Sequence, residues 1–329
     1  MKIRSKGGRF APIRKAFIRK DSAAEIAVLR KLRAFLDATE PELVRLLVTT
    51  WNTQGRAITY KELREALLRG DIDPAYLQEW MEDYSRFVTV HLQPAWDKAM
   101  ASATAEIAAK YPEWRFDPYG LGVREWVTNR AAEFVTNIST TQMLGLRAVV
   151  QRAAVLENLS VDELARVIRP MVGLTHQQSV ANLNYYNLLI DSGTSAKRAQ
   201  DLAVRYAARQ HRYRGFMIAR TELAFAYNQG SYEGTKQAQE AGYMGETVKV
   251  WCTADDERVC KICGGLEGKT IGMAEDFDFQ TKLATPDNPT IRKVPPAHPH
   301  CRCTVLYEEI APPKQEKKPI MIDQIAEIG

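Results

Sequence analysis

Two short stretches near the carboxyl end of the chain decide how the fold is interpreted. Residues 260–263 read Cys-Lys-Ile-Cys, and residues 295–303 read Pro-Pro-Ala-His-Pro-His-Cys-Arg-Cys. The segment between them is poor in apolar residues, so burial of apolar surface alone cannot order it. A Cys-x-x-Cys pair on one tight turn is typical of half a structural zinc site, and one tetrahedral zinc ion would join both ends of the segment. We therefore expect a small zinc-knuckle-like module.

The expected ligands come from both stretches. Cys260 and Cys263 form the first pair, while Cys252 is expected to be a packing residue. The second pair comes from a set of four candidates: His298, His300, Cys301 and Cys303. Three alternatives to zinc remain open, namely disulfides, a redox pair and free buried thiols. Disulfides are disfavoured because the first residues lack the apolar core of a secretory signal, and a redox pair because no thioredoxin-like pattern surrounds the cysteines.

The sequence before these stretches has a helical pattern almost throughout. Side chains that can cap helix starts precede apolar residues at helical spacing at four places: Ser22, Thr59, Ser160 and Thr175. Thr194 is expected to cap a helix that ends near Tyr213, and a second helix is expected over residues 214–241. Pro94 is expected to kink or end the helix that begins near Pro74.

Irregular and β-type segments complete the pattern. Residues 111–120, rich in aromatic and turn residues, are expected to separate two helical regions. Residues 247–252 alternate and are β-branched, which predicts a strand, and shorter strands are expected at 269–271 and 304–307. The expected fold class is α+β and mostly α, with an elongated helical body followed by the small α+β module.

The charge of the chain is concentrated at its start. The 329 residues have 45% hydrophobic and 26% charged content and a net charge of +5, which is ordinary globular usage. Residues 1–20 carry +8 and no acid, so residues 21–329 sum to −3. The cations of this arm are Lys2, Arg4, Lys6, Arg9, Arg14, Lys15, Arg19 and Lys20. The arm is either a solvated, flexible terminus or a segment that binds a polyanion such as DNA.

The carboxyl-terminal third resembles a known family. Four pieces carry the resemblance in this order: Ile218–Glu222, Asn228–Gly230, the run from Trp251 through Asp255–Cys260 to Lys269, and Pro295–Cys303. Each piece is weak alone, but their order and spacing resemble the phage Mu F-like minor head protein family, also called the phage head morphogenesis family. The resemblance places the metal role on His298 and not on His300, which leaves four of Cys260, Cys263, His298, Cys301 and Cys303 as ligands.

The charge and helix pattern together with the resemblance give an expected domain organisation, and the resemblance implies a function. The expected units are a basic flexible arm (1–20), an N-terminal helical region (21–110), a central helical region (119–195), the Mu F-like domain (196–308) and a linker or tail (309–329). The implied protein is a minor capsid protein of a tailed bacteriophage, located in the virion and, during assembly, in the host cytoplasm. Its implied partners are the portal protein, the major capsid protein or a scaffold protein. The resemblance does not cover the arm, and contact of the arm with DNA is expected from its charge alone. No small-molecule substrate is expected. No membrane is expected either, since no stretch is apolar enough to span a bilayer.

A docking contact is also expected on the long helix. Arg220 and Glu222 are two residues apart, so they cannot pair on one helical face. The family pattern implies that Arg220 reaches a partner outside its helix, and Asp255 or Asp256 is the candidate, which would dock the helix against the zinc module.

The principal alternative function is an HNH-type metal-dependent nuclease, because cysteine pairs beside His-Pro-His superficially fit one. That chemistry needs a ββα unit, and Pro312 and Pro313 follow the last strand instead of a helix. An ADP-ribosyltransferase is disfavoured because Ser139–Thr141 lies within a helical pattern. The sequence therefore predicts a protein that is not an enzyme.

Overall fold

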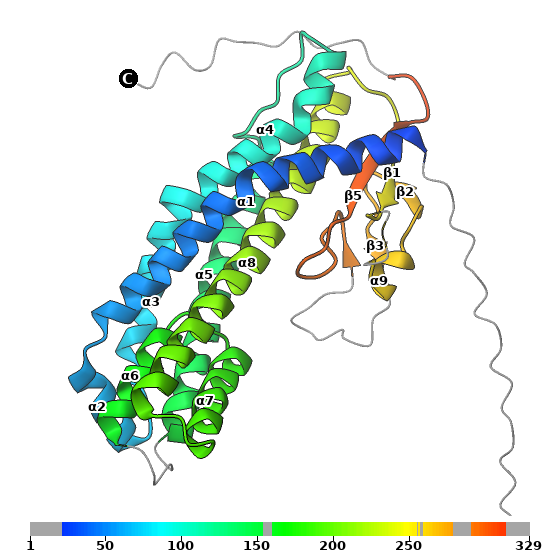
Figure 1. The fold of residues 1–329 in the computed structure, drawn as a ribbon. Helices are drawn as coiled ribbons and strands as arrows, with labels where there is room; N and C mark the ends of the chain where they lie inside the picture. Colours follow the sequence, from blue (N-terminus) through cyan, green and yellow to red (C-terminus); the bar gives the residue numbers. More distant parts are fainter. Residues whose placement is uncertain (1–21, 154–159, 255, 257–258, 279–290, 314–329) are drawn as a thin grey trace, which may run out of the picture.

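The computed structural model describes residues 22–153, 160–254, 256, 259–278 and 291–313 (Figure 1). Its helices before the carboxyl-terminal module are α1 (Ala23–Ala57), α2 (Tyr60–Arg69), α3 (Ala75–Phe87), the π-helical turn η1 (Val88–Leu92), α4 (Gln93–Lys110), α5 (Leu121–Ala153), α6 (Val161–Ile168), the 3-10 turn η2 (Arg169–Met171), α7 (His176–Asp191) and α8 (Ala196–Glu240). The module contains β1 (Thr247–Cys252), α9 (Lys261–Gly264), β2 (Thr270–Gly272), β3 (Phe277–Asp278), β4 (Ile291–Arg292) and β5 (Thr304–Glu309). The predicted fold class, a long helical body followed by a small α+β module, is confirmed.

The helix starts follow local side-chain chemistry. Ser22, Thr59, Ser160 and Thr175 each cap a helix through a complete capping box, in which the side chain three residues later returns a hydrogen bond. The four predicted caps are therefore confirmed. They could be predicted because a cap depends on residues only three positions apart. The π-helical turn lies just before Pro94, where a kink or an end was expected, and the chain remains helical through it.

The longest helix, α8, differs from the prediction. The sequence predicted two helices that meet at residues 213 and 214, whereas α8 runs unbroken over 45 residues, with Ser195 and not Thr194 as its N-cap. The predicted break is wrong because polar residues interrupt the apolar stripe there but still face inward. His211 and Arg214 are both buried, at 4% and 3% exposure.

One continuous apolar core fills the helical body. It includes residues of all of the long helices, from Leu32 on α1 to Tyr227 on α8. Helices α4 and α8 approach very closely, because a Cβ atom added to Gly230 would lie 2.4 Å from the Cα atom of Met100. Glycine is therefore required where the two helices cross. Among the described helices, none combines the length and apolar character that crossing a lipid bilayer requires.

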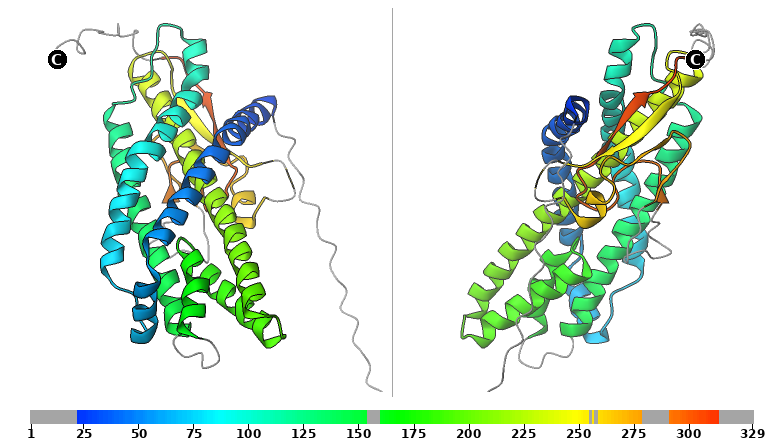
Figure 2. Two further views of the ribbon diagram at one scale, coloured as in Figure 1. Left: turned by 60° about the vertical axis from the view of Figure 1, so that its left-hand side comes forward. Right: turned by 90° about the vertical axis from the view of Figure 1, so that its right-hand side faces the viewer.

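The carboxyl-terminal module has its own small core beside α8. Its three-stranded antiparallel sheet has the order β2-β1-β5, and β3 pairs with β4 in a second, two-stranded sheet that the sequence did not predict. Trp251 and Phe277 pack edge to face at the centre of the module's core, with ring centroids 5.0 Å apart. Figures 1 and 2 show the module alongside the carboxyl-terminal half of α8, with the first half of α1 crossing toward β5.

Candidate metal centre

The first cysteine pair is held by the short helix α9. Cys260 is the N-cap of α9, and its Sγ accepts a hydrogen bond from the backbone N–H of Cys263 at 3.4 Å. This turn brings both sulfurs to one side of the chain. The arrangement is the local geometry that a Cys-x-x-Cys half-site supplies to zinc.

His298 approaches this pair from the second stretch. Its Nε2 atom lies 3.0 Å from Sγ of Cys260 and 3.2 Å from Sγ of Cys263. Its other ring nitrogen, Nδ1, lies 2.7 Å from the carbonyl oxygen of Pro299. Donation of the Nδ1–H to that carbonyl leaves the Nε2 lone pair facing the two thiols, as in histidines that bind a metal.

Two more cysteines complete the cluster. Sγ of Cys263 lies 3.7 Å from Sγ of Cys301, and Cys263, Cys301 and Cys303 form one compact group, while Cys260, Cys263 and His298 form another. Within each group the ligand atoms lie within 4.8 Å of one another. Two sulfurs on one tetrahedral zinc, each about 2.3 Å from the metal, are about 3.8 Å apart. The spacing between Cys263 and Cys301 therefore fits zinc.

All five expected ligand residues are thus brought together, and Cys263 belongs to both groups. His300 and Cys252 belong to neither group. A set of soft sulfurs with one imidazole favours zinc, which would tie the segment before β5 to α9. The pKa of the Cys301 thiol is lowered by hydrogen bonds from Cys263 and Cys303, whose own pKa values are raised.

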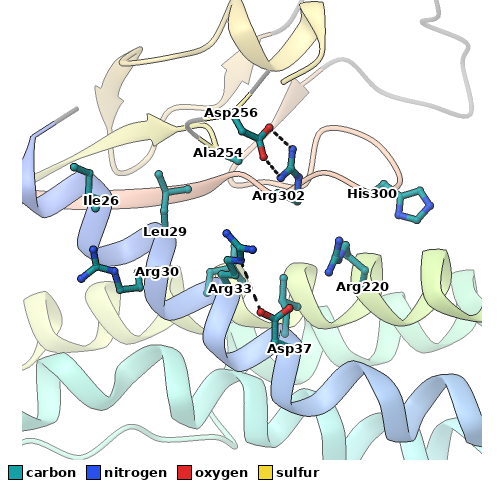
Figure 3. Close-up of a pocket in the computed structure, with 12 residues that line it drawn as sticks. Ile26, Leu29, Arg30, Arg33, Asp37, Arg220, Ala254, Asp256, His300 and Arg302 are labelled. Carbon is teal, nitrogen blue, oxygen red and sulfur yellow. Dashed lines mark hydrogen bonds and ion pairs between the residues drawn. The ribbon is translucent and has the colours of Figure 1, made fainter. Parts of the chain in front are cut away.

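An ion pair lies directly beside the cluster. The guanidinium of Arg302 binds both carboxylate oxygens of Asp256, and its Nη2 lies 2.7 Å from Oδ1 (Figure 3). The contact links the Cys-Arg-Cys segment to the loop that leads from β1 to Cys260. Asp256 therefore acts within the module.

The partner predicted for Arg220 is wrong. Arg220 does reach a partner outside its helix, but that partner is Glu40 on α1, at 2.7 Å and 2.9 Å, and not Asp256. Asp255, the other candidate, lies outside the described residues. The pair joins α8 to α1 inside the helical body, with Glu40 only 3% exposed.

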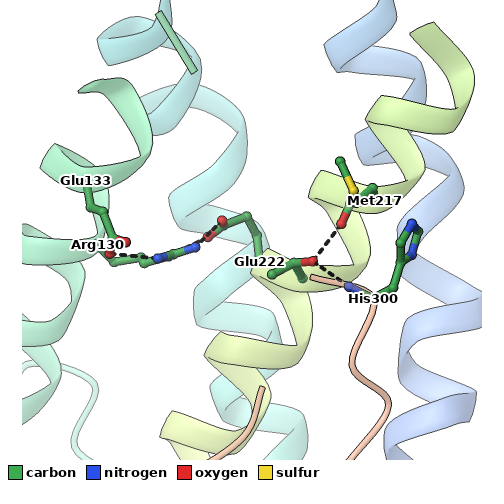
Figure 4. A network of polar contacts seen from close by, with 6 residues as sticks. Arg130, Glu133, Met217, Glu222 and His300 are labelled. Carbon is green, nitrogen blue, oxygen red and sulfur yellow. Dashed lines mark hydrogen bonds and ion pairs between the residues drawn. The ribbon is translucent and has the colours of Figure 1, made fainter. Parts of the chain in front are cut away.

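Glu222 also stays within the helical body. It accepts a hydrogen bond from Nε of Arg130 on α5 at 2.8 Å, and Arg130 also contacts Glu133 at 2.7 Å (Figure 4). Burial raises the pKa of Glu222, while Arg130 opposes this shift. Both residues expected to dock the module therefore hold helices of the body together.

The residues that do dock the module were missed. Oγ1 of Thr221 accepts a hydrogen bond from the backbone N–H of His300 at 3.3 Å (Figure 4). Nδ2 of Asn228 donates to the carbonyl oxygen of Cys303 at 3.4 Å, and Oγ1 of Thr304 donates to Oδ1 of Asn228 at 2.9 Å. The available signal was Asn228 itself, a polar side chain on an inward-facing position of α8.

The candidate nucleic-acid contacts lie outside the described residues, since the arm falls within residues 1–21. Lys2, Arg4, Lys6, Arg9, Arg14, Lys15, Arg19 and Lys20 therefore stay predictions.

Comparison with known proteins identifies a family. Residues 159–306 match the model of the family described as "Phage Mu protein F like protein". The match runs from the start of α6 into β5, so it includes the metal cluster and all of α8. The resemblance inferred from the sequence is confirmed. No curated protein and no solved structure matches the chain.

Proposed function

Residues 159–306 belong to the phage Mu protein F-like family, and on this premise we propose that the chain is a minor head protein of a tailed bacteriophage that acts in head assembly near the portal. The observation that carries the proposal is that the family match covers both α8 and the complete cysteine cluster. The expected location is the virion, with the host cytoplasm as the site of assembly.

The proposed role of the module is structural and not catalytic. The charged groups beside the cysteines are engaged in ion pairs that hold the fold, as in Arg302 with Asp256 and Arg220 with Glu40. His298 faces the thiols with one nitrogen and the Pro299 carbonyl with the other, which supports a ligand role over that of a general base. Zinc bound here would act as a clamp between α9 and the segment before β5.

The proposed partners are the portal protein, the major capsid protein or a scaffold protein. The basic arm is proposed to contact packaged DNA, because eight cations without an acid release counterions when they bind phosphates. Deletion of residues 1–20 should then abolish salt-sensitive DNA binding and leave the far-ultraviolet circular dichroism unchanged. Unchanged binding would remove the arm from the proposal.

The test is made on phage particles. Mass spectrometry of purified virions should detect the chain in a few copies per particle, and a phage that lacks the gene should yield few infectious heads. A plasmid that encodes the wild-type chain should restore infectivity, a Cys263→Ser variant should fail to, and Cys252→Ser should succeed. Absence from virions together with normal head yield would contradict a head function.

The nuclease alternative has a separate test. Purified chain incubated with plasmid DNA and magnesium, manganese or zinc is expected to leave the DNA intact. Metal-dependent cleavage that is lost in a His298→Ala variant would favour the HNH-type nuclease and overturn the structural role.

A further inference from the structure

A cavity of about 680 Å³ separates the first half of α1 from the metal module (Figure 3). Ile26 and Leu29 on α1 and Ala254 after β1 supply apolar surface. Arg30, Arg33, Arg220 and Arg302 supply cationic groups from α1, α8 and the Cys-Arg-Cys segment. Asp37 and Asp256 also line the cavity, beside Arg33 and Arg302, so it has an apolar part and a charged part in which arginines outnumber acids.

The two arginines on α1 are available to a ligand. Arg302 and Arg220 are held by Asp256 and Glu40, respectively. Arg30 is exposed, and no ion pair or hydrogen bond joins it to another residue of the described ranges. Arg33 has only a 3.8 Å contact with Asp37, and such an exposed pair contributes little. Ile26, one turn before Arg30, is 40% exposed. An apolar segment that carries acids would match this surface.

Two segments outside the described ranges are apolar and carry acids without a cation, but residues 154–159 have a single acid and join α5 to α6. Residues 1–20 carry only cations, and residues 279–290 contain one lysine and one aspartate. Residues 320–328 read Ile-Met-Ile-Asp-Gln-Ile-Ala-Glu-Ile, with two acids, no cation and mostly apolar side chains. We propose that residues 320–328 bind in this cavity of the same chain, with Asp323 and Glu327 facing Arg30 and Arg33.

The spacing within the segment fits the cavity. Met321, Ile325 and Ile328 recur at the i, i+4, i+7 spacing of an amphipathic helix, which would place Asp323 and Glu327 on another side. Apolar side chains then pack on Ile26 and Leu29 while the acids meet the arginines at the rim.

The chain is long enough to reach the cavity. Strand β5 lies beside α1 and leads to Pro313, the last described residue. Residues 314–319 join Pro313 to the segment and span up to about 20 Å when extended, which is about the length of a six-residue strand. A linker of this length can run back along β5, whose contacts with α1 bring it beside the helix that carries Ile26.

The test is photo-crosslinking in the full chain. p-Benzoylphenylalanine at position 26 should give a crosslink to residues 320–328, identified by mass spectrometry in a species of monomer mass. The same crosslinker at Leu188, an exposed position of α7, should give none to that segment. A crosslink found only at dimer mass would identify a second copy as the occupant and overturn binding within one chain.

Charge reversal tests the recognition itself. Asp323→Lys with Glu327→Lys should lower the crosslink yield roughly tenfold, because two attractive pairs become repulsive. Adding Arg30→Glu and Arg33→Glu to the same chain should restore the yield. Each variant changes exposed or terminal positions, and circular dichroism checks that it is folded. A yield that is insensitive to these charges, or a crosslink elsewhere, would overturn the proposal.

Discussion

Buried polar residues in the helical body determine how its stability depends on pH. The Nε2 atom of His211 lies 2.8 Å from the carbonyl oxygen of Val172, and its ring packs against Trp51. Burial lowers the pKa of His211 to about 4, with a further lowering from the cation of Arg214. The folded chain thus keeps this imidazole neutral at pH values where the unfolded chain protonates it.

The free energy of unfolding should therefore fall as the pH is lowered from about 6.5 to 4, because the unfolded state binds the proton and the folded state does not. The loss from His211 alone is about 3 kcal/mol at the acid end of that window. His211→Gln keeps an N–H donor but cannot titrate. Its free energy of unfolding, measured by urea denaturation, should therefore fall less steeply than that of the wild type as the pH is lowered. His176→Gln, at an exposed position of α7, is the matched control. If the free energy of unfolding of His211→Gln falls with pH as steeply as that of the wild type, this account is contradicted.

The ion pair between Arg220 and Glu40 gives a second prediction at the residue scale. Arg220→Ala leaves the carboxylate of Glu40 buried without its cation, so the free energy of unfolding should fall by about 3 kcal/mol. The matched control is Arg45→Ala, which breaks the exposed pair with Glu42 on the same helix and should cost less than about 1 kcal/mol. Equal effects in the two variants would mean that Glu40 finds another partner.

At the scale of elements, the contact between α8 and β5 depends on Asn228. Asn228→Ala removes the acceptor of Thr304 and the donor to Cys303, which costs about 1–3 kcal/mol for each buried group left unpaired. Amide hydrogen exchange should become faster in β5 and β1 and stay unchanged in the first half of α8. Lys236→Ala, at an exposed position of the same helix, should leave the exchange pattern as in the wild type. Uniform acceleration along α8 would contradict a local role for Asn228.

Features of the elements that depend on neighbouring residues could be predicted from the sequence, whereas features that depend on tertiary packing could not. Helix starts at Ser22 and Thr59, and the strand at residues 247–252, were predictable because each depends on neighbouring residues. The five cysteine and histidine positions that lie close together were predictable for the same reason, since each half of the cluster is a short motif. The partner of Arg220 was not, because Glu40 is far away in sequence and the choice among acids depends on tertiary packing. The continuity of α8 was missed because inward-facing His211 and Arg214 resemble a break in an apolar stripe.

At the scale of the whole molecule, the described residues form a large apolar core in the body, another in the module, and a small apolar cluster that includes Trp114 and Tyr243. The core of the body and the core of the module share no residue among the described ranges, and the module's core contains Trp251. Metal is therefore expected to stabilise the module far more than the body.

The purified chain should contain about one zinc per molecule, and a chelator should change the near-ultraviolet circular dichroism, to which Trp251 contributes, while the far-ultraviolet helical signal persists. Cys263→Ser should abolish metal binding, because Cys263 belongs to both ligand groups. Cys252→Ser, outside both groups, should retain the metal. A chain that holds no metal yet has an intact module would show that the thiols serve only as packing groups.

The unbroken length of α8 sets both the distance and the relative rotation between the body and the module. Its 45 residues extend for about 68 Å, and both the body and the module are attached to this single rod. One residue inserted between His211 and Thr221 would turn the module by about 100° relative to α7, whereas seven would add about 10 Å and nearly restore its orientation. Across related chains, insertions and deletions in this stretch should therefore comprise nearly whole helical turns, because other lengths would change the orientation of the module relative to the body.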